Sequence, residues 1–328
     1  MTSIKEQPFL PIIIQSGQHA YGVARSFYAA YRVKSLVIEP AKKGRSMRSL
    51  FLGGSQGIAT QNSGILDFQY VEHLDDPALF VQALVRVAMQ CQQKKLILLV
   101  CDCYYAELII ENKKKLEKYF ILPYIDQALL KMVQTKEKFY QLCDKYQLKY
   151  PPKTIIITKE HHPNRDLPIQ YPIIIKPSNA VTYTNCSFPE KKKIYLVHDA
   201  EEMEHIIRCI YRSSYQDTLI VQEFIPGDDS YIRVLDVYVG RDRKVKLMCV
   251  SNKLLEDPSP QNKGISLAVM TDYDEQLMES IRYFLEDIGY TGFANFDMKY
   301  DIRDGKYKLF EMNLRAGGVK LLCDRKRV

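Results

Sequence analysis

The chain has 328 residues, of which 46% are hydrophobic and 26% are charged. This balance is typical of a folded globular protein, and the length is enough for two or three packed units. No apolar run approaches the roughly 20 residues that a membrane-spanning helix needs, and residues 1–11 lack the pattern of a secretion signal. We therefore expect a cytoplasmic protein without membrane insertion.

The net charge of +7 arises from 46 basic and 39 acidic residues. The basic residues gather in short runs, of which 113–115, 191–193 and 325–327 are the clearest. Such an excess suits phosphorylated substrates as well as it suits nucleic acid. Because the sequence has no nucleic-acid-binding motif, we expect no nucleic acid as a partner. The eight cysteines lack the spacing of a zinc site, and we expect reduced thiols.

The first third of the chain alternates apolar strands with amphipathic helices. The expected order is strand 10–14, helix 21–31, strand 35–39, a helix with apolar positions at Phe80, Leu84, Val87, Ala88 and Cys91, and strand 96–101. This rhythm is typical of a parallel sheet with helices on its faces. Gly17 and Gly22 lie where the first strand turns into the first helix. Without the G-x-G-x-x-G pattern, however, we do not expect a dinucleotide site.

A predicted helix at 104–119 leads into a second unit of mixed character. Its elements are expected in the order helix 135–146, strands 153–158 and 172–176, a polar loop at 177–193, a helix with apolar positions at Met203, Ile206, Ile207, Ile210 and Tyr211, and strand 218–224. From residue 230 onward strands dominate, apart from one helix with the apolar stripe Leu277, Ile281, Phe284, Leu285 and Ile288. The predicted fold class is therefore α/β combined with α+β.

The most informative stretch is 294–313, where two predicted strands carry carboxylates. Asp297 lies on one strand, and Glu311 and Asn313 share a face of the next. Magnesium prefers hard oxygen ligands from few side chains, with phosphates and water completing its shell. The alternative is a polar, solvated sheet face on which Lys299 screens Asp297. We favour the metal site because both strands are otherwise strongly apolar.

The turn between these strands predicts how the carboxylates meet. A three-residue loop over 303–305, with Gly305 in the left-handed conformation, pairs Ile302 with Lys306. Counting back from that pair places the two carboxylates directly opposite each other. A two-residue loop would turn them to opposite faces of the sheet.

Two further segments have the chemistry of a nucleotide site. Lys176 ends a buried apolar strand, which suits a fixed phosphate contact, although a lysine can also simply reach solvent from a strand end. The segment 221–229 runs from an apolar strand into an acidic turn. It can offer backbone groups to an adenine ring and an acid to ribose hydroxyls.

The order of these pieces resembles the ATP-grasp superfamily, and the resemblance covers roughly residues 9–318. It includes the ending Phe-Glu-Met-Asn-Leu-Arg-Ala-Gly-Gly at 310–318. The resemblance implies a Rossmann-like pre-ATP-grasp domain at 1–122. It also implies an N-terminal grasp subdomain, the small lid, at 123–222 and a C-terminal grasp subdomain at 223–328, with ATP between the two.

The same resemblance implies the nucleotide contacts. Lys136 and Lys176 would bind the phosphates, and Ser178 with its polar neighbours would donate from a loop that contains no glycine. The adenine would be framed by Gln222, Glu223 and Ile225. Asp229, or failing that Asp228, would hold the ribose.

The resemblance also implies the catalytic and metal-binding residues. Arg315 would stabilise the transferring phosphoryl group, and Lys253 would be a further phosphate contact. The cofactors would be ATP and Mg²⁺, for which Mn²⁺ could substitute. One or two metal ions would be held by Asp297, Glu311 and Asn313.

Within the superfamily, the segments 17–26, 104–112 and 119–126 resemble carboxylate–amine ligases of the D-aspartate ligase type. Such enzymes attach D-aspartate to a lysine side chain of a peptidoglycan precursor. The carboxylate first attacks the γ-phosphate of ATP to give an acyl phosphate, and an amine then displaces phosphate. The resemblance therefore implies ATP, an amino acid or other carboxylate, and an amine acceptor as partners.

Two other functions stay open. The chain could bind a nucleotide without ligase turnover, or it could be an ATP-grasp ligase for another amino acid or for a carbamate, because substrate choice lies in loops. Relatives continue past the Gly-Gly pair, so we expect a C-terminal truncation. The apolar surface that this would uncover would be exposed or covered in a homodimer.

Overall fold

The computed structural model describes residues 7–15, 17–41, 63–91, 93–148, 150–160, 167–179, 182–183, 185–256 and 266–317. Its chain forms two compact units. The first unit comprises Met1–Leu130, Val234–Asn295 and Asn313–Val328, and the second comprises Lys131–Arg233 and Phe296–Met312. The domain boundaries, the truncation and the homodimer stay predictions, and the expected truncation point at 318–328 lies outside the described residues.

A parallel sheet forms the first part of the first unit, as predicted. Its strands have the order β3-β2-β1-β4-β5, and all its neighbours are parallel. The bounds are β1 Phe9–Ile14, β2 Ser35–Pro40, β3 Leu66–Val71, β4 Lys95–Val100 and β5 Phe120–Ile121. In β1 the consecutive residues Ile12, Ile13 and Ile14 are fully buried. Because consecutive side chains point to opposite faces, both faces of this sheet are covered.

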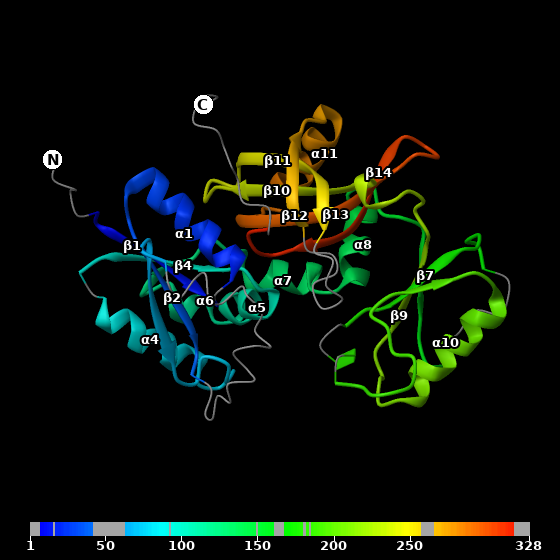
Figure 1. Ribbon diagram of the computed structural model, residues 1–328, viewed down its shortest axis with the longest axis horizontal. Helices are drawn as coiled ribbons and strands as arrows, with labels where there is room; N and C mark the ends of the chain where they lie inside the picture. The colour runs from blue at the N-terminus through cyan, green and yellow to red at the C-terminus, as the bar shows by residue number, and fades with distance from the viewer. Residues whose placement is uncertain are drawn as a thin grey trace. The chain divides into compact units, whose positions relative to one another are not determined.

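The helices of this part follow the predicted rhythm. Their bounds are α1 Gln18–Tyr31, α4 Phe80–Gln90, α5 Cys103–Glu111, α6 Lys113–Leu116 and α7 Gln127–Val133. Helix α1 lies against one sheet face, where Ala20 and Ala24 pack on Ile13, Val37 and Leu99 (Figure 1).

The predicted helix at 104–119 is wrong in one respect, because it is divided into α5 and α6. The division falls at Asn112, whose side-chain Nδ2 donates to the carbonyl of Leu108 at 3.0 Å. An asparagine that bonds to nearby backbone competes with a continuing helix. The short strands β3 and β5 and the helix α7 were not predicted.

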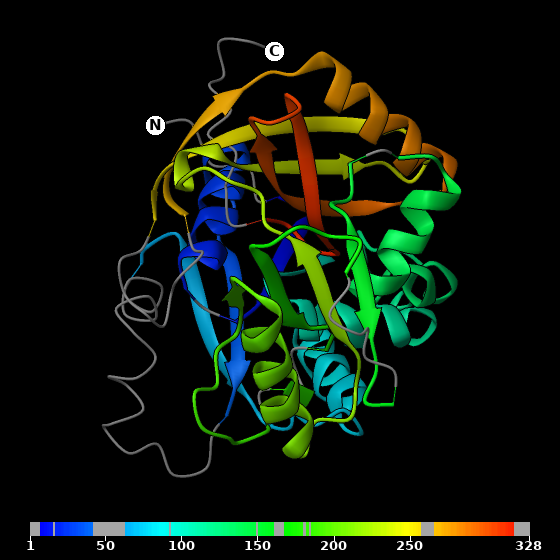
Figure 2. The same ribbon diagram turned by 90° about the vertical axis from the view of Figure 1, so that its right-hand side faces the viewer.

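The second unit contains an antiparallel sheet covered by one helix. The strand order is β6-β9-β7-β8, with bounds β6 Thr154–Ile157, β7 Ile173–Pro177, β8 Tyr195–Val197 and β9 Leu219–Glu223. Helix α10, Ala200–Arg212, runs alongside it, and Ile207 and Ile210 pack on Ile175 and Val221 (Figure 2). Helix α8, Lys136–Lys145, begins where Thr135 accepts a hydrogen bond from the amide of Lys138. The strand β8 was not predicted.

The third sheet has the strand order β12-β11-β10-β13-β14. Its strands are β10 Ile232–Val239, β11 Val245–Glu256, β12 Ser266–Asp272, β13 Gly292–Asp301 and β14 Lys306–Asn313. The predicted helix over Leu277 is α11, Glu275–Asp287, capped by Asp274, which accepts from the amide of Leu277 at 2.8 Å. The division between the two units falls within β13 and β14 and just inside β10.

The hairpin of β13 and β14 has a longer loop than predicted. The strands end at Asp301 and restart at Lys306, so the loop comprises 302–305 instead of 303–305. Gly305 has φ 67, the predicted left-handed conformation, and its amide donates to the carbonyl of Asp301 at 2.9 Å. The pairing of Ile302 with Lys306 is therefore wrong.

The two carboxylates meet despite this longer loop. Glu311 contacts Asp297 through a side-chain hydrogen bond, although the loop is one residue longer than predicted.

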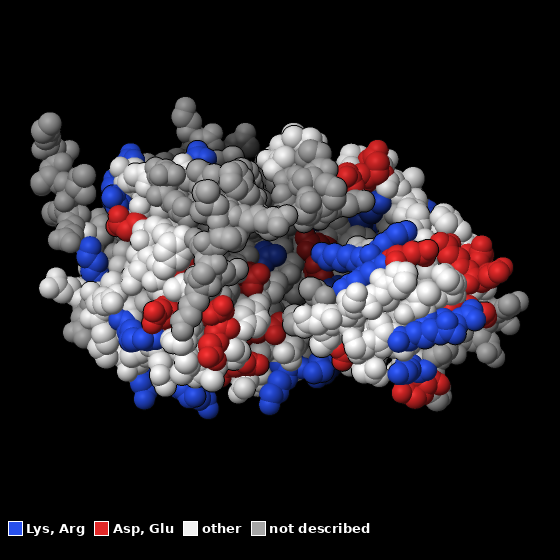
Figure 3. All heavy atoms as spheres, turned by 60° about the horizontal axis from the view of Figure 1, so that its bottom comes forward, with Lys and Arg blue, Asp and Glu red and all other residues white. Residues whose placement is uncertain are grey.

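The described residues also bear on membrane insertion, disulfides and surface charge. No helix in the described ranges is long and apolar enough to cross a membrane, and no cysteine there forms a disulfide. Figure 3 shows acidic and basic side chains interspersed with uncharged ones over one face of the molecule. The basic excess therefore forms no field of a single sign across that face.

Candidate functional site

A buried polar cluster in the second unit holds the amine of Lys176. Its Nζ donates to Oε1 of Gln222 at 3.0 Å and lies 5.6 Å from the centre of the Phe310 ring. The Gln222 amide in turn donates to the hydroxyl groups of Tyr140 and Thr154, both at 2.9 Å. Because an ammonium can only donate, it fixes which way the Gln222 amide points. The lysine is therefore held in one position rather than reaching into solvent.

Burial changes the charge state of this lysine. Burial, and to a lesser extent the nearby Lys136, lower the pKa of Lys176 to about 7, while Glu311 acts in the opposite direction. A lysine with this pKa gives up its proton near neutral pH unless an anion approaches. Such a group gains its charge where a phosphate binds.

Glu311 lies between cations and a second carboxylate. Lys136, the first residue of α8, forms an ion pair with it, and Asp297 is hydrogen-bonded to it. Burial alone would raise the pKa of Glu311, but Lys136 and Lys176 hold that pKa well below its usual range. The carboxylate is therefore ionised at neutral pH.

The two carboxylates fit a divalent cation. Acidic groups at hydrogen-bonding distance repel each other unless they share a proton or a cation. No three His, Cys, Asp or Glu side chains gather as metal ligands in the described ranges, so a cation here would need amide, phosphate or water oxygens as well. That ligand set is the one Mg²⁺ uses at nucleotide sites.

The alternative role of Lys299 is not supported by its contacts. Its amine donates to the carbonyl of Gly227 at 2.5 Å and lies 5.6 Å from the centre of the Phe224 ring. The acids that act on its pKa are Asp229, Asp228 and Asp301. Lys299 therefore contacts the acidic turn.

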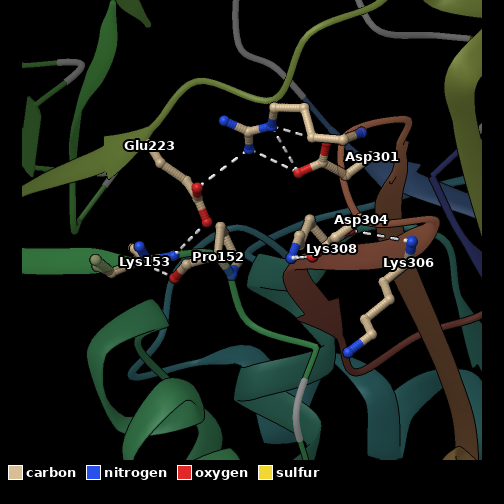
Figure 4. A network of polar contacts seen from close by, with 9 residues as sticks. Pro152, Lys153, Glu223, Asp301, Asp304, Lys306 and Lys308 are labelled. Carbon is tan, nitrogen blue, oxygen red and sulfur yellow. Dashed lines mark hydrogen bonds and ion pairs between the residues drawn. The ribbon is translucent and has the colours of Figure 1, made fainter. Parts of the chain in front are cut away.

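The side chain of Glu223 is held at both oxygens, as Figure 4 shows. Oε1 accepts from the backbone amide of Lys153 at 2.8 Å, and Oε2 accepts from Nη2 of Arg303 at 3.1 Å. Arg303 also binds both oxygens of Asp301. This clamp ties the end of β9 to β6 and to the hairpin loop, and it leaves only the backbone of Glu223 to meet a ligand.

The remaining predicted nucleotide contacts lie on two segments of the second unit. Ile225 is buried. Asp228 accepts from the amide of Ser230 at 2.9 Å and from its hydroxyl at 2.5 Å. Both Asp228 and Asp229 are exposed. Ser178 follows β7, and its hydroxyl accepts from Thr218 at 2.8 Å.

Three predicted residues belong to the first unit. Lys253 lies in β11 opposite Val269, next to a shift of register, and is buried. Asn313 ends β14, and Arg315 acts electrostatically on the buried Asp236. The structure thus brings Lys136, Lys176, Gln222, Asp297 and Glu311 together in the second unit.

A second buried polar cluster, in the first unit, was missed by the sequence analysis. Nδ2 of Asn295 donates to Oδ1 of Asp236 at 2.9 Å, and Nδ2 of Asn313 donates to Oδ1 of Asn295 at 3.2 Å. Burial raises the pKa of Asp236 to about 6, against the lowering effect of Asn295, Arg315 and the Gly317 backbone. The signal that could have found it is a lone acid within the apolar strand β10.

Comparison with known proteins gives one informative relative. No protein-family profile matches the chain. A D-aspartate ligase of Enterococcus faecium (strain Aus0004) is 41% identical over 324 residues, which is 97% of this chain and 73% of that protein.

Solved structures share the fold at low sequence identity. The L-amino acid ligase from Bacillus licheniformis has a TM-score of 0.60 at 12% identity, over 95% of this chain and 68% of that one. The ADP complex of N5-carboxyaminoimidazole ribonucleotide synthetase has a TM-score of 0.60 at 15% identity, over 96% of this chain and 72% of that one. The D-alanine–D-alanine ligase from Bacillus anthracis, complexed with ATP, has a TM-score of 0.54 at 12% identity, over 94% of this chain and 87% of that one. These likenesses show the ATP-grasp fold.

Proposed function

The chain belongs to the D-aspartate ligase family of ATP-grasp enzymes and is an ATP-dependent ligase that forms C–N bonds, and we propose that it works through an acyl phosphate. Its carboxylate substrate is D-aspartate, as in the name of its relative. Its amine acceptor is a lysine side chain of a peptidoglycan precursor.

One observation carries this proposal, namely the pairing of two lysines with two carboxylates in the second unit. Lys176 is buried with a pKa of about 7, and Lys136 is ion-paired to Glu311. Keeping these charges together costs free energy unless a ligand with matching charges binds. A nucleotide triphosphate with its metal supplies phosphate oxygens for the lysines and a cation for the acids.

The metal ligands that we propose are Asp297 and Glu311, with Asn313 two residues further along β14. Magnesium, or manganese in its place, would neutralise phosphate charge when bound. Lys136 now pairs with one oxygen of Glu311, and a bound phosphate would draw its ammonium away from that oxygen. The carboxylate would then be available to the cation.

The other residues would bind and orient the nucleotide. Lys176 and Lys136 contact its phosphates, helped by Ser178 and Lys253. The backbones of Gln222 and Glu223 frame the adenine together with Ile225, because both side chains are committed to other contacts. Asp229 holds the ribose.

The proposed reaction has two steps that need no covalent bond to the protein. A carboxylate oxygen attacks the γ-phosphorus, the bond to the β-phosphate oxygen breaks, and ADP leaves. The amine nitrogen then attacks the acyl carbon, phosphate leaves, and the nitrogen loses a proton. Arg315 stabilises the negative charge on the transferring phosphoryl group.

The test measures phosphate release and product mass. The protein is incubated with ATP, Mg²⁺, a lysine-containing acceptor peptide and each of a set of D- and L-amino acids. We expect acceptor-dependent release with D-aspartate, and a peptide whose mass has grown by one aspartyl residue. Glu311→Gln should reduce turnover by roughly 100-fold or more, whereas Glu201→Gln, on the exposed side of α10, should not. Phosphate release that does not depend on the acceptor peptide would overturn this assignment. Ligation of another amino acid but not of D-aspartate would overturn it as well.

A further inference from the structure

Two asparagine side chains of the first unit join Asp236 to a thiol through a chain of three hydrogen bonds. Asp236 accepts from Asn295 at 2.9 Å, and Asn295 accepts from Asn313 at 3.2 Å. Oδ1 of Asn313 then accepts from Sγ of Cys103 at 3.3 Å. Asp236 and Asn295 are 8% and 3% exposed, so water contributes little to the contact between these two side chains.

The direction of the chain follows from what each group can donate. An ionised carboxylate only accepts, so Asn295 must turn its NH₂ group toward Asp236. Its carbonyl oxygen then faces Asn313 and can only accept, so Asn313 must also donate its NH₂ group. The oxygen of Asn313 is thereby turned away from Asn295, toward Cys103. A single charge at Asp236 thus decides the orientation of two amides.

Burial and the neighbouring groups act on that charge in opposite directions. Burial raises the pKa of Asp236 to about 6, whereas Asn295, Arg315 and the Gly317 backbone favour the ionised form, so the carboxylate is ionised above that pH. Gly317 also packs directly on it, because a Cβ atom there would lie 2.0 Å from Oδ1 of Asp236. The residue that anchors the chain of contacts is therefore enclosed by the segment that contains Arg315.

We propose that Asp236 and Asn295 are positioning residues that lock the Asn313 amide with its oxygen presented as a metal ligand. This inference rests on the proposed function, in which Asn313 binds the metal. An amide without such a lock offers NH₂ and oxygen about equally, and an NH₂ group cannot bind a cation. Partners that orient a ligand in this way typically change metal affinity 10- to 100-fold.

The test compares substitutions that keep the shape but release the lock. In Asp236→Asn the side chain keeps its size but can donate as well as accept, so both amides become free to turn over. Asn295→Ala removes the link altogether. We expect each to weaken the binding of Mn²⁺ about tenfold, measured by the loss of the free-ion EPR signal in the presence of ADP. Binding of ADP in EDTA should stay unchanged.

A double substitution separates orientation from general damage. In an Asn313→Asp background the ligand has two equivalent oxygens, so no lock is needed. There Asp236→Asn should leave Mn²⁺ affinity unchanged or improve it, because it removes a second acceptor facing Asn295. An equal loss of affinity in both backgrounds would show that Asp236 acts only through the fold, and would overturn the inference.

A metal-free readout comes from the thiol. The infrared S–H band of Cys103, obtained as a difference against Cys103→Ala, should shift in Asp236→Asn, because the amide then no longer presents only its oxygen. An unshifted band would contradict the lock. If instead the unaltered protein binds no Mn²⁺ with ADP, or Glu311→Gln leaves that binding intact, the metal assignment itself is wrong. If Glu311→Gln abolishes binding but Asp236→Asn does not weaken it, the metal site stands and the lock fails.

Discussion

Lys176→Met should abolish a proton uptake that accompanies nucleotide binding. In the free protein, burial and Lys136 lower the pKa of Lys176 to about 7, against the opposite effect of Glu311. A phosphate next to the amine would raise that pKa again, because an opposite charge favours the protonated form. Above pH 7 the free protein has lost this proton and the complex holds it. Binding therefore takes up a proton, and affinity falls as pH rises.

The size of the effect follows from the two pKa values. With a pKa of about 7 in the free protein and one at least about two units higher in the complex, the Kd rises roughly six- to eightfold between pH 7.5 and 8.5. That change corresponds to about 1.1–1.2 kcal/mol of binding free energy. The substituted protein lacks the titrating group, so its Kd should be weaker at pH 7 but nearly constant over this range.

Calorimetry with ADP measures both quantities. Titrations at pH 8 in buffers of different protonation enthalpy should give an uptake of close to one proton for the unaltered protein and about none for Lys176→Met. Lys138→Met, at an exposed position of the same helix as Lys136, serves as the matched control and should behave like the unaltered protein. A heat of binding that does not depend on the buffer in the unaltered protein would refute the reasoning.

Three further predictions concern backbone and ion-pair positions, and each is read out by urea unfolding. Gly292→Ala should destabilise the protein by more than about 4 kcal/mol. Gly292 has φ 91, and a Cβ atom there would lie 2.0 Å from the carbonyl oxygen of Pro123. A loss of stability below about 1 kcal/mol would contradict that crowding. Gly305→Ala should cost only about 1–2 kcal/mol, the strain of the left-handed conformation, since the nearest atom to its Cβ would be 3.6 Å away. Arg303→Met should cost about 1–2 kcal/mol and weaken ADP binding a few-fold, because the clamp on Glu223 is lost; unchanged ADP affinity would show that the clamp does not shape the site.

The parts of the fold that could be predicted are those set by local sequence. The run of isoleucines in β1 and the helical spacing of apolar residues in α10 and α11 each determine one element, because burial of an apolar face needs no knowledge of distant residues. The break at Asn112 could not be seen from periodicity. It depends on a side chain that bonds to its own backbone.

The sequence indicated which residue types gather at the candidate site, but it did not indicate all the contacts between them. The meeting of Asp297 with Glu311 was expected from the alternation of side chains, but the length of the loop between their strands was not. The ion pair of Lys136 with Glu311 and the contact of Asp236 with Asn295 join residues far apart in the chain. Such pairs follow from how helices and strands pack on one another, which one sequence does not state.

The clamp on Glu223 bears on how the choice of base can change over evolution. Since Arg303 and the Lys153 amide occupy both of its carboxylate oxygens, recognition at this segment would fall to main-chain groups. Main-chain donors and acceptors keep their pattern when neighbouring side chains are replaced. Drift in the residues around the base would therefore alter affinity while preserving the preference for adenine. A switch to another base would require moving the backbone itself.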